Sequence, residues 1–237
     1  MNTRIIKIFF ASARFVRALH VLRHLCLSTG KVPTLCRGRG ILAAALFLPF
    51  FLFSCLDIDT EIIIRPNLTG EVLIKYSISQ AAINIGRIDR QSNFLPLPIE
   101  EQRYRDLAAN VDGLKLLSFR KEERRGEVII TARYEFSNID ALNAVLSNND
   151  AKIEIERRGE RTYFTQKIIN NNRAVSEETR ELAKALFGGR YVNLRLTVPG
   201  NIHTVNLGTA AGNRAFVSYE LPQLLESTGA VVWEVSW

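Results

Sequence analysis

The chain has 237 residues, of which 47% are hydrophobic and 23% are charged, and its mean hydropathy is +0.02. These values exclude a disordered chain, a collagen-like chain and a polytopic membrane protein. The formal net charge of +7 comes from residues 1–54, which hold eight Lys and Arg and no acidic residue. Residues 55–237 contain 23 of the 31 basic residues and all 24 acidic ones, so their net charge is close to zero. The charge of this part therefore gives no support for a nucleic-acid partner.

An apolar segment follows the basic leader. Residues 41–53 are 13 consecutive apolar positions, and Arg37 and Arg39 precede them. As a helix this segment would span about 20 Å, which is short of the roughly 30 Å hydrocarbon core of a bilayer. Its length and basic flank are typical of a signal-peptide hydrophobic region. Residues 1–31 are read either as an amphipathic membrane-surface helix or as an artefact of an upstream start site.

The residues after this segment, Leu52, Phe53, Ser54 and Cys55, resemble the lipobox of bacterial lipoproteins. This resemblance implies cleavage between Ser54 and Cys55, a diacylglyceryl group on the Cys55 sulfur, and acylation of the new amino group with a chain such as palmitate. Two or three acyl chains hold a domain stably, because each buried methylene contributes about 0.8 kcal/mol. Phe53 is bulkier than the usual residue at its position. The alternatives are an ordinary cleaved signal and an uncleaved anchor.

Alternation of apolar and polar residues dominates residues 55–237 and predicts three hairpins. They cover residues 57–78, 114–136 and 151–169, and the last two turn at an identical pentapeptide, Glu123–Glu127 and Glu156–Glu160. Further strands are predicted over 190–198, 202–207, 213–221 and 230–237. Helices are predicted over 99–111, over 138–146 with Ser137 as the cap, and over 177–187.

This order of elements predicts one α+β domain over residues 55–237. We expect a mainly antiparallel, curved sheet built from successive hairpins, with the helices packed on one face, because parallel pairing would need a helix between successive strands. Residues 80–98 fit neither a helix nor a strand, and a loop of that length is either a functional cover or a misread element.

No catalytic motif is present in the sequence, and the body has one histidine, His203, and one cysteine, Cys55. We therefore predict no enzymatic activity, no cofactor and no metal site. Asp57, Asp59 and Glu61 alternate on one strand, where they could hold a hard cation or form a solvated strand face. A hydrolase that relies on an unidentified carboxylate pair is a third, weaker hypothesis.

Two predicted turns are rich in arginine. Arg124 and Arg125 lie on one hairpin, and Arg157 and Arg158 lie on the next, so together they could form one positive end of the sheet facing an anionic membrane. Glutamates lie between these arginines and reduce the field. Ordinary solvated turns are therefore the alternative interpretation.

Several short patterns in the body resemble the LppM-like domain of bacterial envelope lipoproteins. They are a hairpin directly after the cysteine, the Phe136–Leu142 step from strand into helix, Val198-Pro199-Gly200, and Asn206 followed by an aromatic strand. The resemblance covers most of residues 55–237. It implies a curved sheet that grips a helix, similar to START-like folds, with an apolar interior able to take a lipid or glycolipid.

Six aromatic residues could line such an interior, or could pack a closed core: Tyr76, Tyr134, Phe136, Phe164, Tyr191 and Trp233. The sequence thus predicts a non-enzymatic envelope lipoprotein that faces the periplasm or the exterior and binds a lipid or glycolipid. The alternative is an interaction module with a closed core that scaffolds other envelope proteins. In both interpretations the partner is a membrane through the covalent lipid, and protein partners are unknown.

Overall fold

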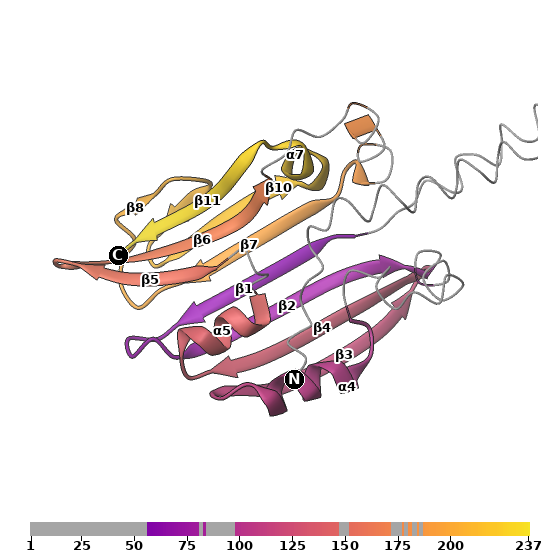
Figure 1. Cartoon of the computed structure of the whole chain (residues 1–237), viewed down its shortest axis with the longest axis horizontal. Helices are drawn as coiled ribbons and strands as arrows, with labels where there is room; N and C mark the ends of the chain where they lie inside the picture. Colours follow the sequence, from indigo (N-terminus) through magenta and orange to yellow (C-terminus); the bar gives the residue numbers. More distant parts are fainter. Residues whose placement is uncertain are drawn as a thin grey trace, which may run out of the picture.

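The computed structural model describes residues 56–80, 83, 98–146, 152–171, 177, 180, 181, 184 and 187–237. Their strands form two sheets (Figure 1). The larger sheet has seven strands in the order β3-β4-β2-β1-β7-β10-β9. Their bounds are β1 Ile58–Ile64, β2 Gly70–Ser79, β3 Leu114–Arg124, β4 Glu127–Phe136, β7 Tyr191–Thr197, β9 Thr209–Ala211 and β10 Arg214–Glu220.

The smaller sheet has four strands in the order β5-β6-β11-β8. Their bounds are β5 Ile153–Arg158, β6 Arg161–Asn171, β8 Thr204–Val205 and β11 Gly229–Ser236. Among the described residues there are three helices, α4 Glu101–Asn110, α5 Ile139–Leu146 and α7 Leu221–Glu226. The predicted α+β class and the three hairpins β1–β2, β3–β4 and β5–β6 are confirmed.

Strict alternation explains why these segments form strands. On β1, Ile58, Ile62 and Ile64 are buried, whereas Asp59 and Glu61 between them are half-buried on the opposite face. On β4, five alternate residues from Val128 to Phe136 are buried in the same way. Successive side chains of a strand point to opposite faces, so each strand gives one apolar face to the core.

The arrangement of the strands differs from the single curved sheet that the sequence predicted. The β5–β6 hairpin does not extend the larger sheet, because β6 pairs with the C-terminal strand β11 and forms a separate sheet. The pairing is also not wholly antiparallel. β1 pairs with β7 in parallel, with Ile58 opposite Val192. The two strands are far apart in the sequence, so the chain between them serves as the crossover that parallel pairing requires.

The helix predictions are confirmed in outline and corrected in detail. The helix predicted over 99–111 is α4, and the one predicted over 138–146 is α5. The cap of α5 is Asn138 and not Ser137, because the backbone N–H of Ala141 donates to Oδ1 of Asn138 at 2.7 Å. Most of the helix predicted over 177–187 lies outside the described residues, as does most of 80–98. β9 and α7 were not predicted, and the strand predicted over 202–207 is reduced to two residues.

One hydrophobic cluster joins the two sheets and the helices. It includes inward residues of every long strand, together with Ala141, Leu142 and Val145 of α5 and Tyr104 of α4. The side chain of Asn143 on α5 bonds both backbone groups of Ile153, with distances of 2.8 and 2.9 Å. This pair of hydrogen bonds fixes α5 to the first residue of β5 and so ties the helix to the smaller sheet.

Candidate functional site

The predicted lipidation site lies at the boundary of the described structure. Leu52, Phe53, Ser54 and Cys55, with the whole of the leader 1–54, are outside the described residues. Leu56, the first described residue, packs against the hydrophobic core. Asp57 follows, and its carboxylate accepts from Nη1 of Arg190 at 2.8 Å and from the backbone N–H of Tyr191 at 3.0 Å. The chain is therefore held to the domain from the residue directly after Cys55.

No helix among the described residues is both long enough and apolar enough to cross a bilayer.

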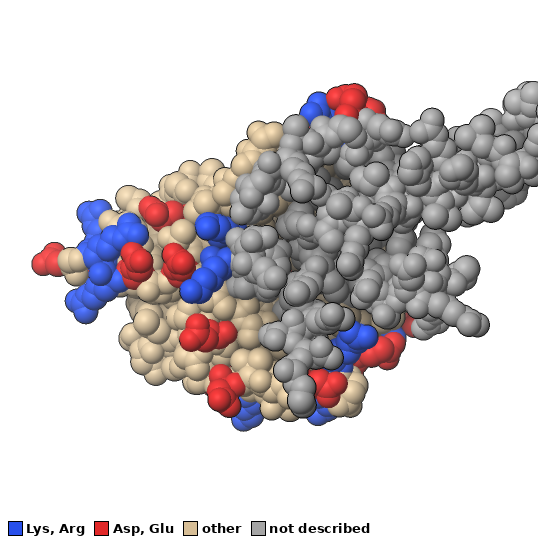
Figure 2. Space-filling view, viewed as in Figure 1, with Lys and Arg blue, Asp and Glu red and all other residues tan. Residues whose placement is uncertain are grey.

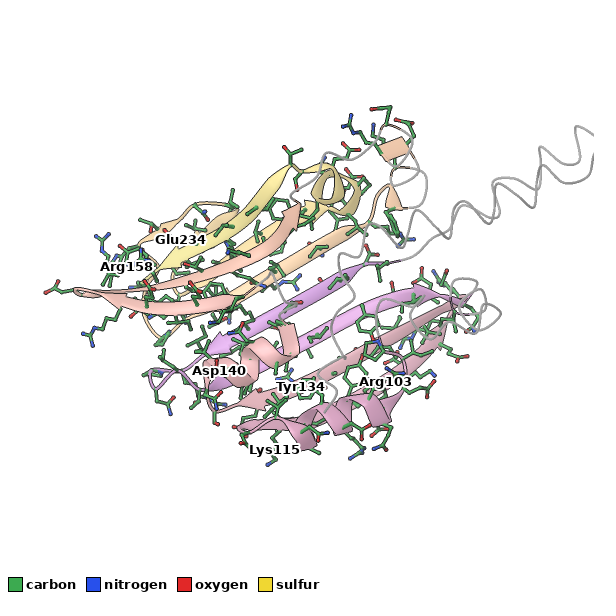
Figure 3. The ribbon with its side chains drawn as sticks, in the orientation of Figure 1. Arg103, Lys115, Tyr134, Asp140, Arg158 and Glu234 are labelled. Atoms are coloured by element: carbon green, nitrogen blue, oxygen red, sulfur yellow. The ribbon has the colours of Figure 1, made fainter. Side chains whose placement is uncertain are left out.

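The six predicted aromatic residues do not form one group. Tyr76 and Tyr134 lie together under α4 with a third tyrosine, Tyr104, whose ring centroid is 6.4 Å from that of Tyr134 (Figure 3 labels Tyr134). Tyr104 lies on the helix predicted over 99–111, and nothing in the sequence indicates that it joins the other two. Only the packing of α4 against β3 and β4 brings the three together.

The three hydroxyls under α4 form a buried polar cluster. The Tyr104 hydroxyl donates to the carbonyl oxygen of Pro98 at 2.7 Å, and the Tyr76 hydroxyl contacts both that oxygen and the Tyr104 hydroxyl. The Tyr134 hydroxyl donates to the backbone oxygen of Tyr104 at 3.3 Å. Burial raises the pKa of all three tyrosines well above the ordinary value, because a phenolate would lose its hydration there.

Phe164 and Trp233 belong to the smaller sheet and pack against each other. Their ring centroids are 5.9 Å apart in an edge-to-face arrangement, and neither side chain is exposed. The indole N–H of Trp233 donates to the backbone oxygen of Leu207 at 3.1 Å. Phe136 is also fully buried, beside Gly70, where an added Cβ would lie 2.7 Å from the phenyl ring.

Tyr191 is separate from all of these residues. It is 44% exposed and lies on the outer face of β7, so it does not share the interior with the other five. The reason is its position in the strand alternation, in which Val192, Leu194 and Leu196 point inward.

Asp59 on β1 and Asp57 just before it are paired with residues of β7 and with Arg190, which precedes β7. Asp59 Oδ1 accepts from Asn193 at 3.1 Å and from Arg195 at 3.4 Å, while Asp57 is held by Arg190. Within the described part of the chain, no three His, Cys, Asp or Glu side chains lie close enough together to hold a metal ion.

The two arginine-rich turns lie at opposite ends of the molecule, which corrects the expectation of one positive end (Figure 1). The β3–β4 turn lies at the end where β2 finishes, since Gln80 N–H donates to the Gly126 oxygen at 2.8 Å. The β5–β6 turn lies at the end where the chain terminates, since Thr162 N–H donates to the Trp237 oxygen at 2.8 Å. Figure 2 shows basic side chains gathered at that second end.

One surface groove, of about 340 Å³, is lined by described residues only. It lies beside the β1–β2 turn, at the end of the larger sheet opposite the β3–β4 turn. Its lining includes the charged residues Arg65, Lys115 and Glu135 and the apolar residues Leu114 and Phe136. Arg65 donates there to Glu71 at 2.8 Å and to Glu135 at 3.3 Å. A lining that contains an ion pair and a lysine does not suit an acyl chain.

No protein-family model matches the sequence, and no curated protein matches it. Among solved structures, the chain is similar to the folded domain of LppM from Mycobacterium tuberculosis, determined by NMR. The two are 11% identical, the match covers 78% of this chain and 91% of that one, and the TM-score is 0.45. A match at this level of similarity says nothing about lipidation, ligands or partners.

Proposed function

We propose that this chain is a lipid-anchored, non-enzymatic protein of the bacterial cell envelope, attached through Cys55 and facing the periplasm or the exterior. The observation that carries the proposal is the lipobox-like run from Leu52 to Cys55, directly followed by residues that are already part of the folded domain. Leu56 packs on the core and Asp57 is bonded to Arg190, so the acylated residue would be joined to the body without a linker.

The anchor is tested by replacing Cys55 with alanine in the full chain. We expect Cys55→Ala to lose incorporation of an alkyne-labelled palmitate analogue and to move from the membrane fraction to the soluble fraction. Cys36→Ala is the matched control, since it removes a cysteine of the predicted leader and leaves Cys55 in place. Labelled, membrane-bound Cys55→Ala protein would contradict the proposal.

Within this proposal, the sequence favours binding of a lipid or glycolipid in the apolar interior. The support is the number of buried aromatic side chains and the polar cluster of Tyr76, Tyr104 and Tyr134 beneath α4, which could face a ligand's polar group. Native mass spectrometry of the mature protein, after gentle extraction, tests this activity. We expect a reproducible additional mass of one lipid, and a clean apo mass would argue against it.

The packing of the described core favours the second candidate, an interaction module for other envelope proteins. Phe136, Phe164 and Trp233 have no exposed surface, and the last two fill the interior by contacting each other. Side chains packed in this way leave no room for an acyl chain between them. Cross-linking in intact cells followed by identification of captured proteins tests this function, and repeated recovery of the same envelope protein is the expected result.

A further inference from the structure

The first residues of β1 define one end of the larger sheet, and Cys55 must lie close to it. Asp57 is fixed by Arg190 and Tyr191, and its backbone oxygen accepts from Ser77 N–H at 3.2 Å. Cys55 is two residues earlier, so its Cα is at most about 7 Å beyond Asp57. A lipid on Cys55 would therefore bring this end of the domain near the membrane surface.

The β3–β4 turn projects from the same end. β4 is the second strand from β1 in the sheet, so it is about 10 Å away at about 4.8 Å per strand. Asp57 is level with Ser77, and Ser77 is opposite Ile129. Gly126 is three residues before Ile129 and so extends about 10 Å beyond that level. The tip of this turn thus reaches as far along the sheet axis as Cys55 can.

The tip carries two exposed arginines. Arg124 is 68% exposed and its Nη2 is 2.8 Å from Oε2 of Glu122. Arg125 is exposed at the first position of the turn, and no residue of the described structure forms an ion pair with it. A guanidinium group presents its donors in a planar fork that matches phosphate oxygens, so these side chains suit phospholipid headgroups.

The second turn with the same pentapeptide lies far from this end. The β5–β6 turn begins after Arg158, and its neighbour Thr162 contacts Trp237, which lies beside Gly200 just beyond the end of β7. β6 alone has 11 residues, which corresponds to about 35 Å between this turn and the opposite end of the strand. Figure 3 shows Arg158 at the end of the molecule away from the first residues of β1.

We propose that the β3–β4 turn lies against the phospholipid headgroups of the membrane that holds Cys55, with Arg124 and Arg125 as its contacts, and that the β5–β6 turn points away from that membrane. This inference rests on the proposed lipid anchor at Cys55. It adds an orientation of the domain and a second, non-covalent contact with the membrane. Arg124 and Arg125 then lie at the membrane, whereas Arg157 and Arg158 lie at the end of the domain away from it.

The two identical pentapeptides supply a matched experiment. Glu123 and Glu156 occupy the same place in each, and both are exposed, so Glu123→Cys and Glu156→Cys can each carry a fluorescent label while all arginines remain. The mature lipidated protein, which lacks the leader cysteines Cys26 and Cys36, is placed in phosphatidylglycerol vesicles that contain headgroup spin-labelled lipid. We expect several-fold stronger quenching of the label at position 123 than at 156. Equal quenching, or stronger quenching at 156, would overturn the proposed orientation.

A second variant tests the arginines themselves. Arg124→Gln with Arg125→Gln is expected to reduce quenching of the label at position 123 several-fold, whereas Arg157→Gln with Arg158→Gln leaves it unchanged. If the first pair of substitutions has no effect, the proposed contact is wrong. The acyl mass on Cys55 is measured by mass spectrometry in each sample. A missing lipid contradicts the anchor at Cys55. Equal quenching at positions 123 and 156 on lipidated protein, or stronger quenching at 156, contradicts the orientation.

Discussion

Arg190 and Asp57 meet across 133 positions of sequence, with Nη1 of the arginine 2.8 Å from Oδ2 of the aspartate. The arginine side chain is 21% exposed and also lies 4.0 Å from Glu127 at the start of β4. This contact joins the first residues of β1 to β7 and to the base of the β3–β4 hairpin. The contact therefore links three strands at the end of the sheet that is next to Cys55.

Replacing Asp57 with asparagine should weaken this end of the sheet. We expect Asp57→Asn to lower the free energy of unfolding by about 0.5 to 1 kcal/mol, since the aspartate is partly exposed and solvent screens the pair. Urea denaturation measures the change. Asp59→Asn is the control, because its arginine partner, at 3.4 Å, is more exposed. A larger loss for Asp59→Asn than for Asp57→Asn would contradict this account.

The β3–β4 turn stores backbone strain that the β5–β6 turn lacks. Arg125 has a φ of 52°, a conformation that asparagine and glycine tolerate and long side chains disfavour. We expect Arg125→Asn to raise the free energy of unfolding by about 0.5 to 1 kcal/mol. Arg158→Asn, in the other pentapeptide, should change it little, because only Gly159 has a positive φ there. Equal effects of the two substitutions in thermal unfolding would refute the assignment of strain.

Truncation of Phe164 separates a filled core from a ligand cavity. If the ring fills the space beside Trp233, Phe164→Ala should lower the free energy of unfolding by about 3 to 5 kcal/mol, as large-to-small core substitutions do. If the space instead opens to a cavity that holds lipid, the loss should be much smaller. Tyr191→Ala is the control and should stay within about 0.5 kcal/mol, since Tyr191 is on the surface. Chemical denaturation of purified protein measures both.

The buried tyrosines predict a loss of stability in alkaline solution. Burial raises the pKa of Tyr76, Tyr104 and Tyr134 in the folded state, so above the ordinary tyrosine value of about 10 the unfolded chain loses protons that the folded chain keeps. Their contribution is therefore complete below about pH 10 and is lost as the pH rises, by up to about 1.4 kcal/mol per tyrosine per pH unit.

Substitution of one tyrosine checks the origin of this loss. Tyr134→Phe keeps the ring and removes one ionisable hydroxyl. Because burial also raises the pKa of Tyr219, the slope of stability against pH above pH 10 should fall by roughly a quarter. Denaturant titrations between pH 9 and 11 give the slopes, and an unchanged slope for Tyr134→Phe would rule out this cause.

Local patterns predicted most of the elements and little of their arrangement. The alternation of β1 and β4 is strict, so their strands and inward faces follow directly from residue order. The parallel pairing of β1 with β7 and the antiparallel pairing of β11 with β6 join segments far apart in the chain, and no local feature selects among possible partners. The position of Tyr104 in the core could not be predicted for the same reason. It lies beside Tyr76 and Tyr134 only because α4 packs against the sheet there.

The repeated pentapeptide shows where local information ends. In the first copy the loop is Arg125-Gly126, and in the second it is Gly159-Glu160, one position later. Each hairpin adopts the register that buries its own inward residues, Val128 and Ile130 in one and Phe164 in the other, because a slip by one residue would turn every side chain to the wrong face.

The sequence by itself determined the lipobox-like run at Cys55, the α+β class and the hairpins, since these depend on neighbours along the chain. Only the tertiary structure decided which arginines share an end with Cys55, because that depends on strand order and register, which are set by burial across the whole core.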